Sequence, residues 1–254
     1  MIVTALMVFG IFTFALGAGV PDPSPGYRIF QTISLTIETD GMNGTLQLLQ
    51  DERITDELRD NMHGSDDGMY CYEDALGAFC ESIRTTPLKP TLVRLVDGVG
   101  RVVDSRTFKR ELGSMEVRKL YGRRPRAFSV TVDFGIGWGS YAGDITYFFD
   151  LKGGRLRWLT ARGRTGGVQI EVTAMTSLKT SWQLVRSGGG GGQDILEIAC
   201  RPKFSPGRAD EDVAFELIFR RFHFHGGGWI ISERRTPGFW EDDKEFPGPG
   251  EFPQ

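Results

Sequence analysis

The chain is poor in the residues that build metal and redox sites. Its 254 residues include only three cysteines and three histidines. No two cysteines have the Cys-x-x-Cys spacing and no His-Glu-x-x-His motif occurs, so zinc-knuckle, thioredoxin-like and common zinc-protease classes find no support. His223 and His225 would need at least one further converging ligand to hold a metal ion. We therefore predict no metal site and no cofactor.

Basic residues are absent from the start of the chain, where the first one is Arg28. Residues 2–16 are almost entirely apolar and are followed by small residues at 17–19. This pattern predicts a signal peptide over residues 1–19 that is removed on export, with an uncleaved anchor as the alternative. The apolar run is short for a bilayer span, so the mature chain is expected to leave the membrane. The expected location is periplasmic or extracellular.

The cysteines fit that compartment. Cys71 and Cys80 are close in sequence, and an exported chain favours a disulfide between them. Cys200 lies in an apolar, strand-like run, where a free cysteine behaves as a small hydrophobic residue. We predict a Cys71–Cys80 disulfide and a buried, free Cys200.

Charge is balanced overall, with a formal net charge of −3, but it is unevenly distributed. Residues 38–81 hold twelve acidic and two basic side chains, whereas residues 101–126 hold nine basic and three acidic ones. One interpretation is that the two segments face each other, or that each forms a separate solvent-exposed surface. The other is that the basic segment forms a patch that binds a polyanion. The patch would extend over arginines 155, 157, 162 and 164. Nucleic acid is not expected as a partner, because the chain is exported and slightly acidic.

Helical periodicity is scarce. Only residues 51–62, with Ile54, Leu58 and Met62 four apart, indicate a helix. Elsewhere apolar and polar residues alternate with a period of two, which is typical of half-buried strands. The fold class predicted is mostly β, an antiparallel meander forming a curved sheet or open barrel, with one or two short helices in the N-terminal half.

The β-rich domain is expected over residues 20–235, with residues 121–126 as the boundary of a two-domain alternative. The remaining residues, 236–254, are rich in proline, glycine and acid. That composition argues against a packed element, while the aromatic residues in this tail offer anchors along the domain surface.

One hairpin can be predicted to the residue. Gly153-Gly154 suits a two-residue type I′ turn, which needs positive φ at both positions. This register places Phe149 opposite Trp158 on one face and Asp150 opposite Arg157 on the other. A slip by one residue would separate the apolar sets, so the pattern fixes the pairing.

The long strand expected over residues 213–225 has an irregular pattern. Its apolar residues up to Phe219 share one face, but Phe222 and Phe224 fall on the other. A β-bulge at residues 220–221 would restore a single apolar face and turn the two histidines away from the core. The alternative is a strand buried on both faces beyond that point.

The glycine-rich residues 135–143 are the predicted ligand-binding element. They resemble a phosphate-binding loop only superficially, because they lie between two expected strands rather than between a strand and a helix. Glycines let a ligand approach the backbone and aromatic rings offer stacking faces, so the predicted contacts are Gly137, Trp138, Gly139 and Tyr141. The alternative is that the rings tuck over the sheet edge.

These features favour a non-enzymatic envelope or extracellular protein that binds a ligand or partner, with no catalytic residue assigned. One alternative is a glycan hydrolase using Asp133 or Asp144, which flank the glycine-rich loop. The other is the polyanion-binding surface.

Overall fold

The structure is a computed structural model. It describes residues 25–56, 59, 85–122, 126–133, 140–164, 166–187, 192–203 and 214–254. The fold is mostly β with antiparallel sheets that do not close into a barrel, which confirms the predicted fold class.

The described residues form a succession of strands, the short helix α1 (Ile37–Asp40), a 3-10 turn, η3 (Pro249–Glu251), and single helical residues at 56, 59 and 85. The strands are β1 (Tyr27–Leu35), β2 (Gly44–Asp51), β3 (Leu92–Asp97), β4 (Val102–Thr107), β5 (Gly113–Arg118), β6 (Ala127–Asp133), β7 (Gly143–Lys152), β8 (Arg155–Trp158), β9 (Thr160–Gly163), β10 (Ile170–Glu171), β11 (Thr173–Ser177), β12 (Thr180–Arg186), β13 (Gln193–Lys203), β14 (Ala214–His225) and β15 (Gly228–Pro237).

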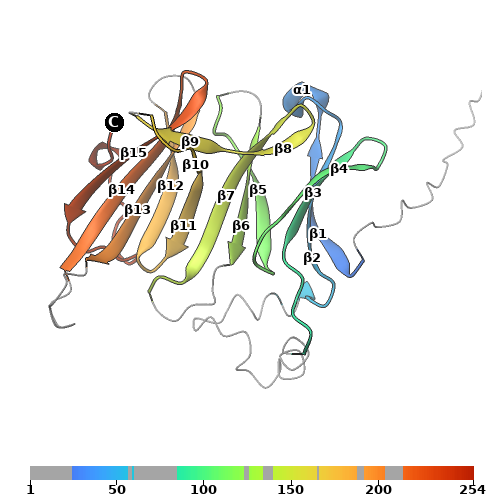
Figure 1. Cartoon of the computed structure of the whole chain (residues 1–254), viewed down its shortest axis with the longest axis horizontal. Coiled ribbons are helices and arrows are strands. Elements are labelled where there is room, and N and C mark those ends of the chain that lie inside the picture. The colour runs from blue at the N-terminus through green and yellow to red at the C-terminus, as the bar shows by residue number, and fades with distance from the viewer. Residues whose placement is uncertain are drawn as a thin grey trace, which may run out of the picture.

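Two sheets make up the molecule. The smaller one has the order β1-β2-β3-β4, and the larger one has the order β10-β9-β15-β14-β13-β12-β11-β7-β6-β5, with β8 beside β7. Figure 1 shows the large sheet as a twisted fan with the small sheet at one end. The chain leaves the β7–β8 hairpin and crosses the fan as β9, which pairs in parallel with β15.

The two sheets share a hydrophobic core. Leu46 and Leu48 of β2 pack in the same buried cluster as Phe128 of β6 and Phe149 of β7, and none of these side chains is more than 1% exposed. Strand alternation explains this arrangement, because every second side chain of β2 and β6 points to the same side of its sheet.

The predicted hairpin between β7 and β8 is confirmed in full. Gly153 and Gly154 have φ of 59° and 70°, and Phe149 pairs with Trp158. On the opposite face, Arg157 donates from Nε to Oδ1 of the buried Asp150 over 2.7 Å.

The predicted β-bulge in β14 is wrong. The strand pairs with β13 and with β15 without a register shift, so it is regular on both sides. Its two faces are both covered: Phe219 packs with Cys200 and Trp240, and Phe222 packs in a separate cluster with Trp229. The alternative, a strand buried on both faces beyond residues 220–221, does not hold either, because Phe224 is 45% exposed and His225 is exposed. His223 is half-buried and His225 is exposed.

The C-terminal residues cover the face of β14 that carries Phe219. Residues 238–254, here called the C-terminal strap, place the rings of Trp240 and Phe252 in the cluster around Phe219. The aromatic anchors expected of this tail are present, but the expectation that its composition prevents packing is wrong, because Trp240 and Phe252 are only 5% and 2% exposed in that cluster.

Cys200 is buried and free, as predicted. The described residues contain no disulfide, so the bond expected between Cys71 and Cys80, which lie outside them, gains no support. Residues 1–19 lie outside the described residues. The start of the helix predicted over residues 51–62 is wrong, because Asp51 ends β2 and residues 52–55 are not helical; residues 56 and 59 are helical, and the others lie outside the description.

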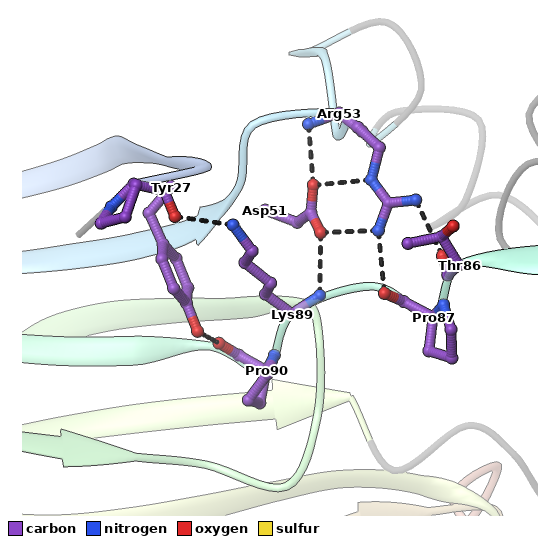
Figure 2. Close-up of polar contacts among 8 residues, drawn as sticks. Tyr27, Asp51, Arg53, Thr86, Pro87, Lys89 and Pro90 are labelled. Atoms are coloured by element: carbon purple, nitrogen blue, oxygen red, sulfur yellow. Dashed lines mark hydrogen bonds and ion pairs between the residues drawn. The ribbon is translucent and has the colours of Figure 1, made fainter.

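An ionic clasp at the end of β2 joins two distant parts of the chain (Figure 2). Asp51 binds the Arg53 guanidinium and also accepts the backbone N–H of Lys89 over 2.8 Å. Arg53 in turn donates to the carbonyl oxygens of Thr86 and Pro87 over 2.8 and 2.9 Å. The clasp thus fixes where the chain re-enters the fold before β3.

Candidate functional site

The large sheet contains a pocket where two of its strands separate. β11 and β12 pair only at Ser177 and Thr180, because β11 continues along β7 while β12 continues along β13. The resulting cavity of about 410 Å³, here called the sheet pocket, is lined by residues of β7 and of β10 to β15.

A chain of alternating charges runs across β13, β14 and β15 toward this pocket. Arg235 donates to Glu216 over 3.1 Å and to Glu233 over 2.7 Å. Arg220 then joins Glu233, over 2.8 Å, to Glu197, over 2.9 Å. The register explains this series, because Arg220 lies directly opposite both Glu197 and Glu233 on its two neighbouring strands.

Glu197 is the most deeply buried member, with 3% of its surface exposed. Its Oε1 accepts the backbone N–H of Met175 over 3.0 Å, and its Oε2 accepts the Arg220 hydrogen bond. Burial raises the pKa of Glu197 above its usual range, although Arg220 and the hydrogen bonds act in the opposite direction. The Met175 bond replaces the ladder bond that β11 loses where it separates from β12.

The pKa of Glu233 shifts in the opposite direction from that of Glu197. Burial raises its pKa, but hydrogen bonds from Arg220 and Arg235 outweigh burial and hold the pKa below its usual range. The three groups Glu197, Arg220 and Glu233 therefore form a polar floor whose hydrogen bonds are satisfied. The rest of the wall combines apolar side chains, Ile145, Ile170, Ala174, Met175, Ala199, Phe222 and Ile231, with the polar Glu171, Thr173, Thr180 and Arg201.

The residues predicted to bind a ligand either lie away from the sheet pocket or fall outside the described residues. Gly137, Trp138 and Gly139 lie outside the described residues. Tyr141 lies in the turn before β7, is 41% exposed, and is not part of the pocket lining. Gly143, which ends the loop, has a packing role, since a Cβ there would lie 1.8 Å from the carbonyl oxygen of Thr176.

Asp133 and Asp144, the residues of the hydrolase alternative, occupy opposite positions in the β6–β7 pairing. The backbone thus brings the two residues side by side, as their flanking positions suggested. The side chain of Asp133 lies outside the description, and Asp144 has an interaction partner.

Several arginines of the expected polyanion patch are bound within the chain. Arg126 donates from Nε to Asp40 over 2.8 Å, which joins the basic segment to the acidic one. Further ion pairs link Arg101 to Asp97, Arg106 to Asp104, Arg118 to Glu116 and Arg157 to Asp150. These pairings reduce the charge that the segment presents to a partner.

The part of the chain that the structure covers contains no group of three or more His, Cys, Asp or Glu arranged to hold a metal ion. His223 and His225 have ring centroids 6.4 Å apart. Within the same residues, no helix has the length and apolar character needed to cross a bilayer.

Searches against protein-family models, curated proteins and solved structures gave no match to this chain. The assignment of the sheet pocket as a candidate site therefore rests on its geometry alone. Sequence reasoning missed Glu197 and Arg220, although each gave a signal: Glu197 interrupts the apolar run at residues 195–200, and Arg220 follows the apolar Phe219. A charge within an apolar strand indicates a buried partner.

Proposed function

We propose that this protein is a non-enzymatic binding protein that holds a small molecule in the sheet pocket. The observation that carries the proposal is the cavity itself, about 410 Å³ and lined by apolar side chains together with charged and hydroxyl-bearing ones. Its volume lies in the range usual for small-molecule sites.

Binding is favoured over catalysis by the state of the carboxylates. A general acid or base needs free hydrogen-bonding reach to its substrate. Each oxygen of Glu197 already accepts a hydrogen bond from the chain, and each oxygen of Glu233 accepts one from an arginine. Such a network fixes the shape of the pocket floor, and buried ion-pair networks shift pKa values without being catalytic.

Export is the second part of the proposal, and it is supported by the apolar segment at residues 2–16. A periplasmic or extracellular binding protein meets its ligand outside the cytoplasm. Cell fractionation with N-terminal sequencing of the recovered protein tests this part, and a cytoplasmic protein that retains residues 1–19 would contradict it.

A substitution that fills the pocket tests the binding function. Thr173 lines the cavity from β11 and is half-buried, so Thr173→Trp is expected to place an indole ring inside it. Thr107→Trp, at an exposed position of the distant strand β4, is the matched control. Ligand-observed NMR with a library of small apolar and polar fragments measures binding to each protein.

Fragments are expected to bind the unmodified protein and Thr107→Trp, and to be lost from Thr173→Trp while its circular dichroism and thermal midpoint stay close to those of the control. If no fragment binds, or if Thr173→Trp binds fragments as well as the unmodified protein does, the sheet pocket is not a ligand site.

A further inference from the structure

Two charged side chains of the sheet pocket differ from the others because the described residues offer them no hydrogen bond or ion pair. Glu171 of β10 and Arg201 of β13 both line the cavity and are exposed. Across the described ranges, neither side chain makes a hydrogen bond or an ion pair, and Arg201 acts on the buried Glu197 only through its charge, which lowers the Glu197 pKa. Glu197, Arg220 and Glu233, in contrast, are all engaged with one another.

The register explains why Arg201 is left without a partner. It lies opposite Glu216 in the β13–β14 pairing, where an ion pair would be expected. The Glu216 carboxylate instead binds Arg235 on the other side, over 3.1 Å. Arg235 also binds Glu233, so the Glu216 carboxylate is held on the β15 side and forms no ion pair with Arg201.

Glu171 reaches the same pocket from β10, two residues before β11 begins. It belongs to the two-residue strand β10, which pairs with β9, the strand that crosses the large sheet (Figure 1). Its partner position in that pairing is Thr160, which carries no charge to neutralise it.

On the basis of the proposed binding function, we propose that the ligand is a small amphipathic zwitterion. Its cationic group binds Glu171, its anionic group binds Arg201, and an apolar segment between them contacts side chains such as Phe222 and Ile231. A ligand of this kind satisfies both unpaired charges, whereas a molecule with one charge leaves the other without a partner. The apolar segment matches the apolar side chains of the wall, which include Ile145, Ile170 and Ala174.

Calorimetric titration of the full chain with matched compounds tests this inference. The zwitterionic probes are ε-aminocaproate and ω-aminooctanoate, which place an amine and a carboxylate at the two ends of an apolar chain. Hexylamine, hexanoate, octylamine and octanoate provide the same chain lengths with a single charge. At low ionic strength we expect the better zwitterion to bind about fivefold more tightly than either singly charged compound of its length.

Charge-removing variants assign each end of the probe. Glu171→Gln is expected to weaken the zwitterion about fivefold without weakening the carboxylate, and Arg201→Gln to weaken it without weakening the amine. The matched controls are Asp243→Asn and Arg155→Gln, both at exposed positions outside the pocket lining, and they should leave binding unchanged.

Equal binding of singly charged compounds and zwitterions would overturn the inference, as would indifference to both pocket variants or no binding of any of these probes. In those cases, fragment binding that is lost in Thr173→Trp would still support the sheet pocket as a ligand site. Loss of that fragment result would instead defeat the proposed function itself.

Discussion

Asp51 and Arg53 form a two-pronged ion pair at the end of β2. Nε of Arg53 donates to Oδ1 over 3.0 Å and Nη2 donates to Oδ2 over 2.8 Å. Backbone N–H groups of Arg53 and Lys89 complete the shell around the carboxylate. Burial alone would raise the pKa of Asp51, but these bonds outweigh it and lower the pKa to about 2.

The clasp predicts a loss of stability in acid. The unfolded chain takes up the Asp51 proton near pH 4 and the folded chain only near pH 2, so protonation favours unfolding. The contribution of Asp51, about 2 kcal/mol, is therefore present above about pH 4 and is lost as the pH falls toward about 2. Urea denaturation across this range, compared between the unmodified protein and Asp51→Asn, measures it.

Asp51→Asn should lower stability at neutral pH and reduce its acid dependence. Asp56→Asn removes the exposed partner of Arg28 and serves as the control, with an expected effect below about 1 kcal/mol. Equal acid dependence in the unmodified protein and Asp51→Asn would contradict the role of the clasp.

A second prediction concerns the buried carboxylate of the β7–β8 hairpin. Arg157→Met leaves Asp150 buried with the Tyr121 hydroxyl, 3.0 Å away, still donating to it. We expect destabilisation by about 3 kcal/mol, because the buried charge loses its counter-ion. Chemical denaturation measures the effect, and Arg157→Met combined with Asp150→Leu should recover part of the loss. A single variant within about 0.5 kcal/mol of the unmodified protein would show that the pair is not needed.

A third prediction concerns the turn of the same hairpin. A Cβ at Gly153 would meet no atom within 4 Å, so its φ of 59° is the main constraint. Gly153→Ala is expected to cost about 1 kcal/mol, whereas Gly153→Asn should cost less, because asparagine adopts the left-handed conformation more readily. Thermal denaturation of both variants checks this order, and an alanine variant as stable as the asparagine variant would refute it.

A fourth prediction concerns the C-terminal strap. Phe252 is 2% exposed and contacts Phe219 edge-to-face at 5.4 Å between ring centroids. Phe252→Ala should destabilise the protein by about 3 kcal/mol through the cavity that it leaves. Val168→Ala, at a position 84% exposed, should stay within about 0.5 kcal/mol. If urea denaturation shows equal, small effects for both, the strap does not belong to the cooperative core.

The hairpin was predictable because its information is local. A turn dipeptide and two alternating segments fix the pairing of Phe149 with Trp158, without reference to the rest of the fold. The strand around Phe222 was interpreted wrongly because its pattern was assumed to report one buried face. Its second cover comes from distant segments, including the C-terminal strap, which the pattern of the strand alone does not reveal.

The sheet pocket was not predictable for a related reason. Its lining extends from Ile145 to Glu233 in the sequence, and it exists only because β11 and β12 separate after one residue pair. The alternation of Glu197 and Arg220 with apolar neighbours pointed to buried charges, but which charges meet depends on the register of β13, β14 and β15.

The parallel pairing of β9 with β15 also constrains the order of folding. Ala161 can meet Trp229 only after the intervening strands have been synthesised and the chain has returned across the sheet. Contacts between such distant residues close large loops and slow the search for the native state. Local pairings such as β7–β8 can form early, whereas the pairing of β9 with β15 must await the last strand of the chain.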